Sequence, residues 1–548
     1  MSGGAFVVVD ASAGEHPLGD SYRLAGTALD AVERRLGDPG TGTSAVGHSQ
    51  RVHHPWWIVN VHEWARPARE WVRLFSSLTY ADCLKESVDI RGNRPLRPPP
   101  RHRPGHLGGP VLPDHPAAPR RASLLSRRRL LATAALATAA VPLGVAPASA
   151  AASGADDADD KAYQLAFAEA LAADRDVRRH STPGREILYR PRQLLAADAD
   201  VRRVTAWLKD SGHQVTVADR FAGVSRLLFA TETDIPAVVA KLRDPRQWQG
   251  QPAPKVQPHH VLLGLGNIMG NPSGPPRAAA ALPPPDPARL GEGAQVTVGI
   301  CDTGIWGQAG SWHPQWLGGA YLPEVDDEDP LYVHTDVLAP QGGHGTFVAG
   351  VVRQAAPGVR VDPEAALGPT GVGDEAMLVA ALSRLVPEVS VVNLSLGGFT
   401  LDDQPSLPLA TALAGLPSTT AVVAAAGNAG SSRPVWPAAL DRVLAVAAVE
   451  AGPTGVLPAP YSGFGPWVDA CAFGRRDSTY VTGRLPLPGR PTRLFHGYAT
   501  WAGSSFATAH VSGRIAALMT AGGLSADAVR LALLATPRWH PDYGVFVG

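Results

Sequence analysis

Residues 295–301 read QVTVGIC, a nearly continuous run of apolar and β-prone side chains. Such a run suits a strand that is buried on both faces of a parallel sheet, because strands of that kind read as nearly continuous apolar segments. The run ends in Asp302-Thr303-Gly304. Since α/β sheets place their functional groups at the carboxyl ends of strands, Asp302 is the first candidate site residue.

The tripeptide Asp302-Thr303-Gly304 is also the active-site tripeptide of aspartic proteases, which is a different fold. The best second copy in the chain is Asp210-Ser211-Gly212. It follows a predicted helix and lacks the apolar strand that this motif requires. The sequence therefore rejects an aspartic protease.

Two further motifs surround a histidine and a serine. His344 lies in GHGTFVAG, residues 343–350, where the flanking glycines permit close backbone approach and the small residues that follow suit a tightly packed helix. Ser505 lies in GSSFATAHVSG, residues 503–513, which leads into an apolar segment typical of a buried helix. A serine at such a helix N-terminus has its hydroxyl at the positive end of the helix dipole.

Two more segments complete the pattern: AAAGN at 424–428, after an apolar run, and NLSLGG at 393–398. With the chain order Asp, His, Ser, the five segments resemble the subtilisin-like (subtilase) family of serine peptidases. The gaps of 42 residues from Asp302 to His344 and of 161 residues from His344 to Ser505 are compatible with that family. The resemblance covers roughly residues 290–548.

The resemblance implies a subtilisin-like three-layer α/β fold, with a mainly parallel central sheet flanked by helices, and a catalytic domain over residues 291–548. It implies a catalytic triad of Asp302, His344 and Ser505, and it assigns Asn428 as the side-chain donor of the oxyanion hole. Substrate is expected to lie extended, as a strand added to the edge segment. The implied substrate-binding residues are Ser395, Leu396, Gly397, Ala425, Ala426 and Gly427.

The chemistry of these residue types agrees with the implied roles. A serine hydroxyl is a poor nucleophile at neutral pH and needs an adjacent base. His344 would take the proton of Ser505 and later give it to the leaving amine, while Asp302 would hold the imidazole in the right tautomer. The family pattern is Gly-Thr-Ser, so Ser504 stands in the threonine position and Ser505 is the predicted nucleophile, with Ser504 as the alternative.

The chain departs from the family pattern in three places. Ala509 stands where a proline is usual, and Phe347 where a histidine is usual. The short stretch 353–361 lacks the longer loop that binds a structural calcium in many subtilases. An acidic insert, EVDDED at 324–329, offers oxygen ligands without the spacing of a defined calcium loop, so a solvated acidic loop is the preferred interpretation. A preference for basic substrates, caused by these acids, is a separate hypothesis. The chemistry requires no cofactor, and a structural calcium stays open but is not indicated.

The distribution of charge argues against one class of partner, and the cysteines argue against a disulfide. The 49 basic and 49 acidic residues balance, but residues 91–129 hold ten arginines and one acid, so the rest of the chain carries a net charge of −9. An acidic remainder argues against a nucleic-acid partner, because binding phosphates needs clustered Lys and Arg. Of the three cysteines, Cys83, Cys301 and Cys471, the last two are expected to be small buried apolar residues rather than a disulfide.

An export signal is predicted at residues 120–150. Arg127-Arg128-Arg129 opens a run of small and apolar residues that ends in Ala148-Ser149-Ala150, and the arginines resemble the twin-arginine motif. A transmembrane helix is the weaker alternative, because the run is Ala-rich and interrupted by prolines. Since the signal begins so late, residues 1–119 are left unassigned, as disordered sequence or as sequence upstream of a true start, for which Val111 is one candidate.

Residues 151–268 predict a small α+β domain. We expect a first helix that ends near Arg178, a strand at 187–189, a helix at about 194–211, strands at 214–218 and 225–230, a helix that Thr233 or Asp234 caps, and a strand at 261–263. The order β-α-β-β-α-β is that of a ferredoxin-like unit. Residues 269–290 are rich in Pro and Gly and predict a linker, where proteases cut. The family resemblance implies that the small domain is a propeptide that assists folding and inhibits the enzyme.

The leading hypothesis is a secreted, monomeric serine endopeptidase of broad or apolar selectivity that acts on polypeptides and binds its own propeptide. One alternative is a dedicated processing protease for a single partner. The other is a catalytically silent subtilase-like binding domain, which would have to keep all three triad residues and Asn428 without using them.

Overall fold

The computed structural model describes residues 5–10, 56–61, 154–264, 274–322, 335–453 and 455–548. The chain forms two compact units, residues 1–118 and 119–548. In the first unit, β1 (Ala5–Asp10) pairs antiparallel with β2 (Trp56–Val61). Cys83, the predicted export signal at 120–150 and the acidic insert at 324–329 lie outside the described residues.

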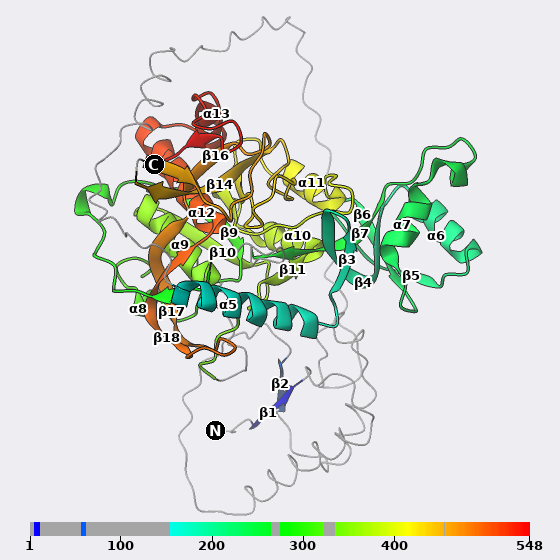
Figure 1. Ribbon diagram of the computed structural model, residues 1–548, viewed down its shortest axis with the longest axis horizontal. Helices are drawn as coiled ribbons and strands as arrows, with labels where there is room; N and C mark the ends of the chain where they lie inside the picture. The colour runs from blue at the N-terminus through cyan, green and yellow to red at the C-terminus, as the bar shows by residue number, and fades with distance from the viewer. Residues whose placement is uncertain (1–4, 11–55, 62–153, 265–273, 323–334, 454) are drawn as a thin grey trace, which may run out of the picture. The chain divides into compact units, whose positions relative to one another are not determined.

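The small domain of the second unit has the predicted β-α-β-β-α-β order (Figure 1). Its sheet has the order β7-β4-β6-β5 with antiparallel neighbours, as in a ferredoxin-like unit. The Asp234 carboxylate accepts a hydrogen bond from the backbone nitrogen of Ala237, so it is the cap of the second helix of this unit. The elements are α5 (Gly154–Ala173), β3 (Arg178–Thr182), β4 (Arg185–Ala197), α6 (Val201–Asp210), β5 (Val215–Phe221), β6 (Val224–Phe229), α7 (Ile235–Arg243), a 3-10 turn (Pro245–Trp248) and β7 (Val256–Leu263).

The predicted helix at about 194–211 begins too early. Leu194 and Leu195 belong to β4, a strand of 13 residues, and helix α6 starts only at Val201. The sequence around Leu194 has good helix formers, but both leucines are fully buried and β4 pairs here with β6 and with β7. Pairing on two sides therefore overrides the local helix propensity.

The large domain is built on a sheet with the order β10-β9-β12-β13-β14-β16-β19, in which every neighbouring pair is parallel. The run that predicts a buried strand forms β9, and all six of its residues are buried. One further strand, β15 (Gly455–Pro458), pairs antiparallel with β14. The parallel strands are β9 (Thr297–Asp302), β10 (Arg360–Ala365), β12 (Val389–Leu394), β13 (Ala421–Ala425), β14 (Val443–Gly452), β16 (Ala470–Phe473) and β19 (Val545–Phe546).

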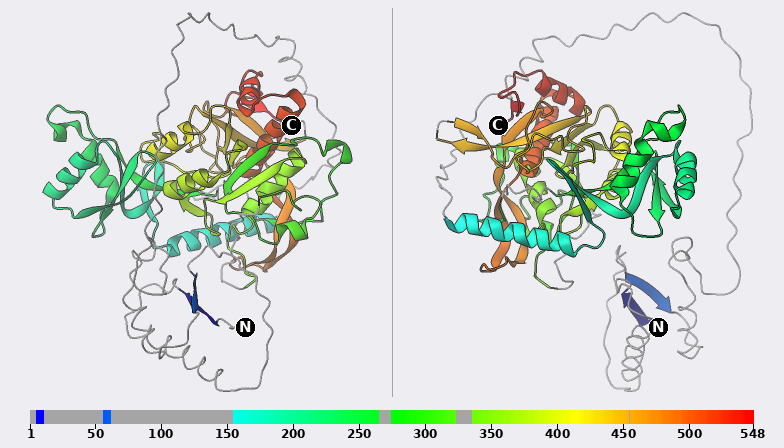
Figure 2. Two further views of the ribbon diagram at one scale, coloured as in Figure 1. Left: turned by 180° about the vertical axis from the view of Figure 1, so that it is seen from behind. Right: turned by 45° about the vertical axis from the view of Figure 1, so that its right-hand side comes forward.

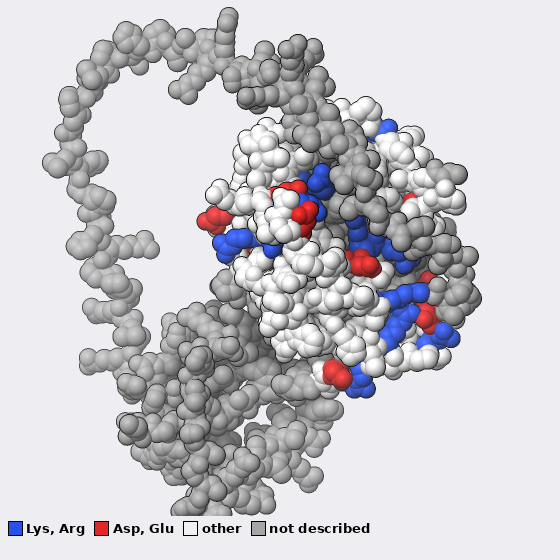
Figure 3. All heavy atoms as spheres, turned by 90° about the vertical axis from the view of Figure 1, so that its left-hand side faces the viewer, with Lys and Arg blue, Asp and Glu red and all other residues white. Residues whose placement is uncertain are grey.

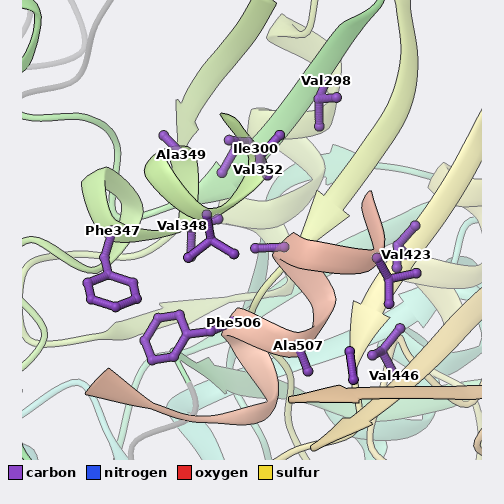
Figure 4. Packing of buried hydrophobic residues seen from close by; sticks show 14 of the residues in the cluster. Val298, Ile300, Phe347, Val348, Ala349, Val352, Val423, Val446, Phe506 and Ala507 are labelled. Atoms are coloured by element: carbon purple, nitrogen blue, oxygen red, sulfur yellow. The ribbon is translucent and has the colours of Figure 1, made fainter. Parts of the chain in front are cut away.

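Helices cover both faces of this sheet and make three layers. Val391 and Val423 point into one core cluster, with α9 (His344–Ala355) and α12 (Ser504–Gly522), whereas their neighbours Val392 and Val422 point into a second cluster. The second cluster contains residues of α10 (Glu375–Arg384) and α11 (Leu407–Ala414). Figure 4 shows the first cluster, where Phe347 and Val348 of α9 face Phe506 of α12.

A second, smaller sheet lies beside α9. β17 (Arg475–Leu485) and β18 (Arg493–Ala502) form a long hairpin, to which β8 (Arg277–Ala278) adds a third strand. β8 falls inside the segment that the sequence marks as a linker, and residues 274–276 just before it are buried. The remaining elements are α8 (Ala309–Trp312), β11 (Val372–Asp374), α13 (Ala526–Leu534) and a 3-10 turn (Pro287–Arg289).

The small domain contacts the large domain through β7 and α5. β7 pairs antiparallel with β11, which extends the small sheet onto the large domain. Helix α5 runs along the large domain (Figure 2), where the Tyr163 hydroxyl donates to the carbonyl oxygen of Pro340 at 2.6 Å. Asp159 of α5 pairs with Arg490 and Arg493 beside the β17–β18 hairpin. Figure 3 shows one face of the molecule, on which most of the described surface is uncharged and basic and acidic side chains lie together in a few small clusters.

Both described cysteines are free and buried, in agreement with the sequence analysis. Burial raises the pKa of the Cys301 thiol, and it raises the pKa of Cys471 to about 12.

Among the described helices, no single one is long and apolar enough to cross a membrane. Helices α12 and α13 reach that length and apolar composition only when they are taken together, and the chain bends by 109° between them.

Glu375 is a buried carboxylate at the contact between the small domain and the large domain. Its Oε1 accepts hydrogen bonds from Gln257 Nε2 (2.7 Å) and Ser406 Oγ (2.5 Å), and its Oε2 accepts one from the backbone nitrogen of His260 (2.9 Å). Burial alone would raise the pKa of Glu375, but its pairing with His260 and the hydrogen bond from Ser406 hold the pKa below its usual value. The charged carboxylate therefore stabilises the folded state.

We predict that Glu375→Gln lowers the free energy of unfolding at pH 7 by about 2 kcal/mol, the cost of losing hydrogen bonds to a charged group. Because the folded-state pKa is lowered, the stabilisation is present above the unfolded pKa of about 4.3 and is lost as the pH falls through the folded value. Urea unfolding at pH 7 and pH 3, in a Ser505→Ala background, measures both effects. Glu388→Gln, at an exposed position, is the control, and an equal effect of the two substitutions at pH 7 would contradict the prediction.

Candidate active site

All the predicted site segments meet at one edge of the parallel sheet. β9 ends at Asp302, β12 ends just before Ser395, and β13 ends just before Ala426. Carboxyl ends of adjacent parallel strands lie at the same edge, which is where α/β folds place their sites. Helices α9 and α12 begin with His344 and Ser504, so their N-termini bring the other two predicted residues.

Asp302 and His344 form a short hydrogen bond. His344 Nδ1 lies 2.6 Å from Asp302 Oδ1, and the exposed fractions of the two residues are 2% and 0%. The same Asp302 oxygen accepts a hydrogen bond from the backbone nitrogen of Thr303 at 2.8 Å. A buried carboxylate on Nδ1 fixes the orientation of the imidazole ring and directs Nε2 away from the strand.

Two further hydrogen bonds hold the start of α9 to the loop after β9. The backbone nitrogen of Gly345 donates to Thr303 Oγ1, and the backbone nitrogen of Trp306 donates to Thr346 Oγ1, both at 2.9 Å. Gly343, just before the helix, has φ +83°, and a Cβ there would lie 2.4 Å from the Tyr480 ring. The glycine therefore provides the close approach that the sequence predicts.

Ser505 lies in the first turn of α12 and is 1% exposed. Its hydroxyl donates to the carbonyl oxygen of Ser395 at 3.4 Å, and the described contacts contain no hydrogen bond between Ser505 and His344. The neighbouring Ser504 hydroxyl accepts from the backbone nitrogen of Gly427 at 3.2 Å. Asn428 Oδ1 accepts from the backbone nitrogen of Ser504 at 2.9 Å, so the Asn428 side chain lies beside the start of α12.

A buried chain of hydrogen bonds connects β12 to α12 behind Ser505. Ser512 Oγ donates to Asn393 Oδ1 (3.0 Å), Asn393 Nδ2 donates to Ser395 Oγ (2.9 Å), and Ser395 Oγ donates to the carbonyl oxygen of Ser505 (3.0 Å). Asn393, Ser395 and Ser512 are fully buried. The sequence analysis did not assign Asn393 or Ser512 to the site, although both belong to the motifs that it singled out.

Aromatic rings surround His344. Its imidazole lies 5.4 Å from the Trp501 ring, nearly perpendicular to it, and 5.3 Å from the Phe506 ring. Phe347, where the family pattern has a histidine, packs 4.4 Å from Phe506 and is fully buried. Phe347 therefore adds an apolar ring to those that pack near His344, the candidate catalytic histidine. Trp501 and Phe506 were not predicted to be near His344, because nothing local in the sequence links them.

The predicted substrate-binding residues differ in what they contact. Gly397 exchanges two backbone hydrogen bonds with Leu263 of β7, at 2.9 and 3.0 Å. Leu396, Ala425 and Ala426 are fully buried. Gly427 has φ +94°, a conformation that favours glycine, and a Cβ there would lie 3.1 Å from Val435.

Within the described part of the chain, no group of three or more His, Cys, Asp or Glu side chains is placed to hold a metal ion. The acidic insert at 324–329 is not among these residues.

Comparison with known proteins identifies the family of this domain. A model of the subtilase family matches residues 293–541. Thermitase from Thermoactinomyces vulgaris is 30% identical over 257 residues, which cover 44% of this chain and 81% of thermitase. The chain belongs to the subtilase family. This subtilase is thus a subtilisin-family serine peptidase with a subtilisin-like α/β fold.

Two other relatives are more distant or matched over less of their length. The thermophilic serine proteinase of Bacillus sp. (strain AK1) is 31% identical to this subtilase over 252 residues, which cover 43% of this chain and 55% of the proteinase. The crystal structure of fervidolysin from Fervidobacterium pennivorans, a keratinolytic enzyme related to subtilisin, matches with a TM-score of 0.45 and 18% identity. That match covers 69% of this chain and 64% of fervidolysin.

We predict that Asn393→Ala lowers the free energy of unfolding by about 2 kcal/mol, because it leaves the buried hydroxyls of Ser395 and Ser512 without their shared partner. Urea unfolding in the Ser505→Ala background measures the change. Ser383→Ala removes an exposed hydroxyl that bonds only to a carbonyl of its own helix, so it is the matched control. A loss below about 0.5 kcal/mol, the range of ordinary surface substitutions, would contradict a stabilising role of this hydrogen-bond chain.

Proposed function

We propose that this subtilase is a secreted serine endopeptidase that hydrolyses peptide bonds through Asp302, His344 and Ser505. The observation that carries the proposal is the 2.6 Å hydrogen bond between Asp302 and His344, at the sheet edge where α12 begins with Ser504 and Ser505. This supports His344 as a base oriented by a buried carboxylate. The Ser504 hydroxyl accepts a hydrogen bond from the backbone nitrogen of Gly427, which supports Ser505 as the nucleophile.

In the proposed reaction, Ser505 Oγ attacks the carbonyl carbon of the scissile bond while His344 Nε2 takes the hydroxyl proton. His344 then gives that proton to the leaving amine as the C–N bond breaks, and an acyl-enzyme is left on Ser505. A water molecule attacks the acyl-enzyme by the same steps, so that the products are one carboxylic acid and one amine. Asp302 stabilises the imidazolium that forms in each half-reaction.

The negative charge on the tetrahedral intermediate needs preorganised donors. The proposed donors are the side-chain amide of Asn428 and the backbone nitrogen of Ser505. Asn428 Oδ1 accepts a hydrogen bond from the backbone nitrogen of Ser504. The other atom of the amide, Nδ2, would lie 3.2 Å from a Cβ placed on Gly503. This supports an Asn428 amide that faces the space next to Gly503 and Ser505.

The proposed substrate is a polypeptide that lies extended along Ser395, Leu396 and Gly397. In the intact chain β7 already pairs with Gly397 and with β11, as a bound strand would. This supports the small domain, residues 151–268, as a propeptide that inhibits the enzyme and assists its folding. We further propose that the protein is exported by the signal at 120–150, acts as a monomer, and needs no cofactor for the chemistry.

Two alternative functions predict different results when the protein is given unfolded polypeptides. A dedicated processing protease would have the same triad but would cleave unfolded general substrates poorly. A silent binding domain would retain the triad geometry and hydrolyse nothing.

We predict that the processed wild-type protein hydrolyses unfolded casein and that Ser505→Ala abolishes this activity, because no nucleophile is left. Ser504→Ala, which changes the adjacent hydroxyl, is the matched control and should keep measurable activity. Activity is measured as release of new amino groups. Activity lost in Ser504→Ala but kept in Ser505→Ala would refute the assignment, whereas an inactive wild type with its propeptide removed would favour the silent binding domain.

A further inference from the structure

Helix α5 presents one row of side chains to the large domain. The row consists of residues at intervals of four, which lie along one face of the helix: Asp159, Tyr163, Phe167 and Leu171. It is about 18 Å long, from the rise of an α-helix. Leu165 and Glu169, between them in sequence, are exposed. Because α5 precedes the β-α-β-β-α-β order of the small sheet, the row is an addition to the ferredoxin-like unit.

The first residue of the row pairs with two arginines. Asp159 accepts hydrogen bonds from Arg490 Nε, just before β18, and from Arg493 Nη2, at the start of β18. Arg493 is held in place by the large domain, because its Nη1 donates to the carbonyl oxygen of Pro276 at 2.7 Å. Burial alone would raise the pKa of the Asp159 carboxyl, but the hydrogen bonds from the two arginines hold this pKa below its usual value. The contact therefore favours a charged acid at this position of α5.

The second residue of the row enters the core of the large domain. Tyr163 is 6% exposed and belongs to the core cluster of α9 and α12. Its hydroxyl donates to the carbonyl oxygen of Pro340 at 2.6 Å and accepts from Gln341 Nε2 at 2.7 Å. The carbonyl oxygen of Gln341 in turn accepts from the backbone nitrogen of His344 at 3.1 Å. A side chain of the small domain thus completes the packing of the turn that leads to the candidate catalytic histidine.

The last two residues of the row lie over the joint between the domains. Phe167 and Leu171 are buried in one small cluster with residues of β7, from the small domain, and with Val372 of β11, from the large domain. They make the helix continuous with the sheet contact described above. The row therefore runs from the β17–β18 hairpin, past the turn before His344, to β11.

The small domain is held at two separate places. At one, β7 pairs with β11, and Leu263 exchanges backbone hydrogen bonds with Gly397. At the other, the side chains of Asp159 and Tyr163 bond to the hairpin and to residues 340–341. When two contacts are joined in one ligand, the second forms as an intramolecular step, and affinity rises by about 10²–10⁴-fold over either contact alone.

The chain that follows the small domain is bound to the large domain by contacts of its own. Trp501 Nε1 donates to the carbonyl oxygen of Gly274 at 3.0 Å, and β8 pairs with β18. The contacts of α5 and β7 named above are made by residues before this point. Cutting the chain between Gly264 and Gly274 therefore breaks none of them.

We propose that α5 is a second docking element of the small domain, which binds the large domain outside the proposed substrate strand and keeps the small domain bound after the chain is cut. Asp159 and Tyr163 supply the recognition, through the arginines of the hairpin and through residues 340–341. The inference rests on the proposed role of the small domain as an inhibitor. It adds that activity appears only after α5 has left the large domain.

Dissociation is measured on the full chain with Ser505→Ala, so that the result does not depend on peptidase activity. The recognition sequence of an added site-specific protease is inserted between Gly264 and Gly274, and the chain is cut to completion. The loss of the small domain after dilution is then followed by size-exclusion chromatography.

We expect Asp159→Asn and Tyr163→Phe each to raise the dissociation rate of the small domain about tenfold or more, because each leaves groups of the large domain without their partner. Glu169→Gln changes an exposed acid on the same helix and is the matched control, which should leave the rate unchanged.

A variant on the other side of the contact separates recognition from a folding defect in α5. The Arg490 side chain is 32% exposed, so Arg490→Gln leaves the core unchanged and should raise the dissociation rate about threefold. Combined with Asp159→Asn, it should raise the rate by less than the product of the two single increases, because both changes remove the same ion pair. An increase equal to the full product would contradict direct pairing.

Equal dissociation rates for wild-type α5, Asp159→Asn and Tyr163→Phe, including complexes that never dissociate, would overturn the role of α5 while leaving the proposed function intact. The cut chain with Ser505 restored is then given casein, and hydrolysis should appear at the rate at which the small domain leaves. Full hydrolysis while the small domain is still bound would overturn inhibition by the bound domain. No hydrolysis after it has left would overturn the proposed function and leave the docking role of α5 intact.

Discussion

The hydrogen bond between Asp302 and His344 joins the last residue of a buried strand to the first residue of a helix, and the rest of the site depends on keeping these two elements fixed. The strand is held by parallel neighbours on both sides, β10 and β12. The helix is held by the hydrogen bonds of Thr303 and Thr346, and by the approach of β17 that Gly343 permits. The packing of β9 and α9 therefore sets the 2.6 Å distance between Asp302 and His344. Because both side chains are buried, they have little freedom to adopt other conformations.

Two residues at this sheet edge also bond to neighbouring segments through their backbone. The carbonyl oxygen of Asp302 accepts from the backbone of Leu367, and the carbonyl oxygen of Ser395 accepts from Ser505. Asp302 therefore contacts Leu367 through its backbone and His344 through its side chain.

Local sequence was sufficient to predict which of these residues lie at the ends of elements. Asp302 ends an apolar strand, His344 begins α9, Ser505 lies in the first turn of α12, and Asn428 follows the run that forms β13. It was not sufficient where tertiary pairing decides. Leu194 looks helical in isolation but is a strand residue between β6 and β7, and the surroundings of His344 include Trp501, which is distant in sequence. The buried chain through Asn393 and Ser512 was missed for the same reason, since its members become neighbours only when α12 packs on the sheet.

The central claim is that the Asp302–His344 pair activates Ser505, and the rate of covalent labelling tests it most directly. The processed protein and its Asp302→Asn variant are reacted with a fluorophosphonate, and the modified residue is located by tandem mass spectrometry. The account predicts a single adduct on Ser505 and a labelling rate about 10⁴-fold lower in the variant, because the imidazole loses its correct tautomer. An adduct on another residue, or equal labelling rates in the two proteins, would contradict it.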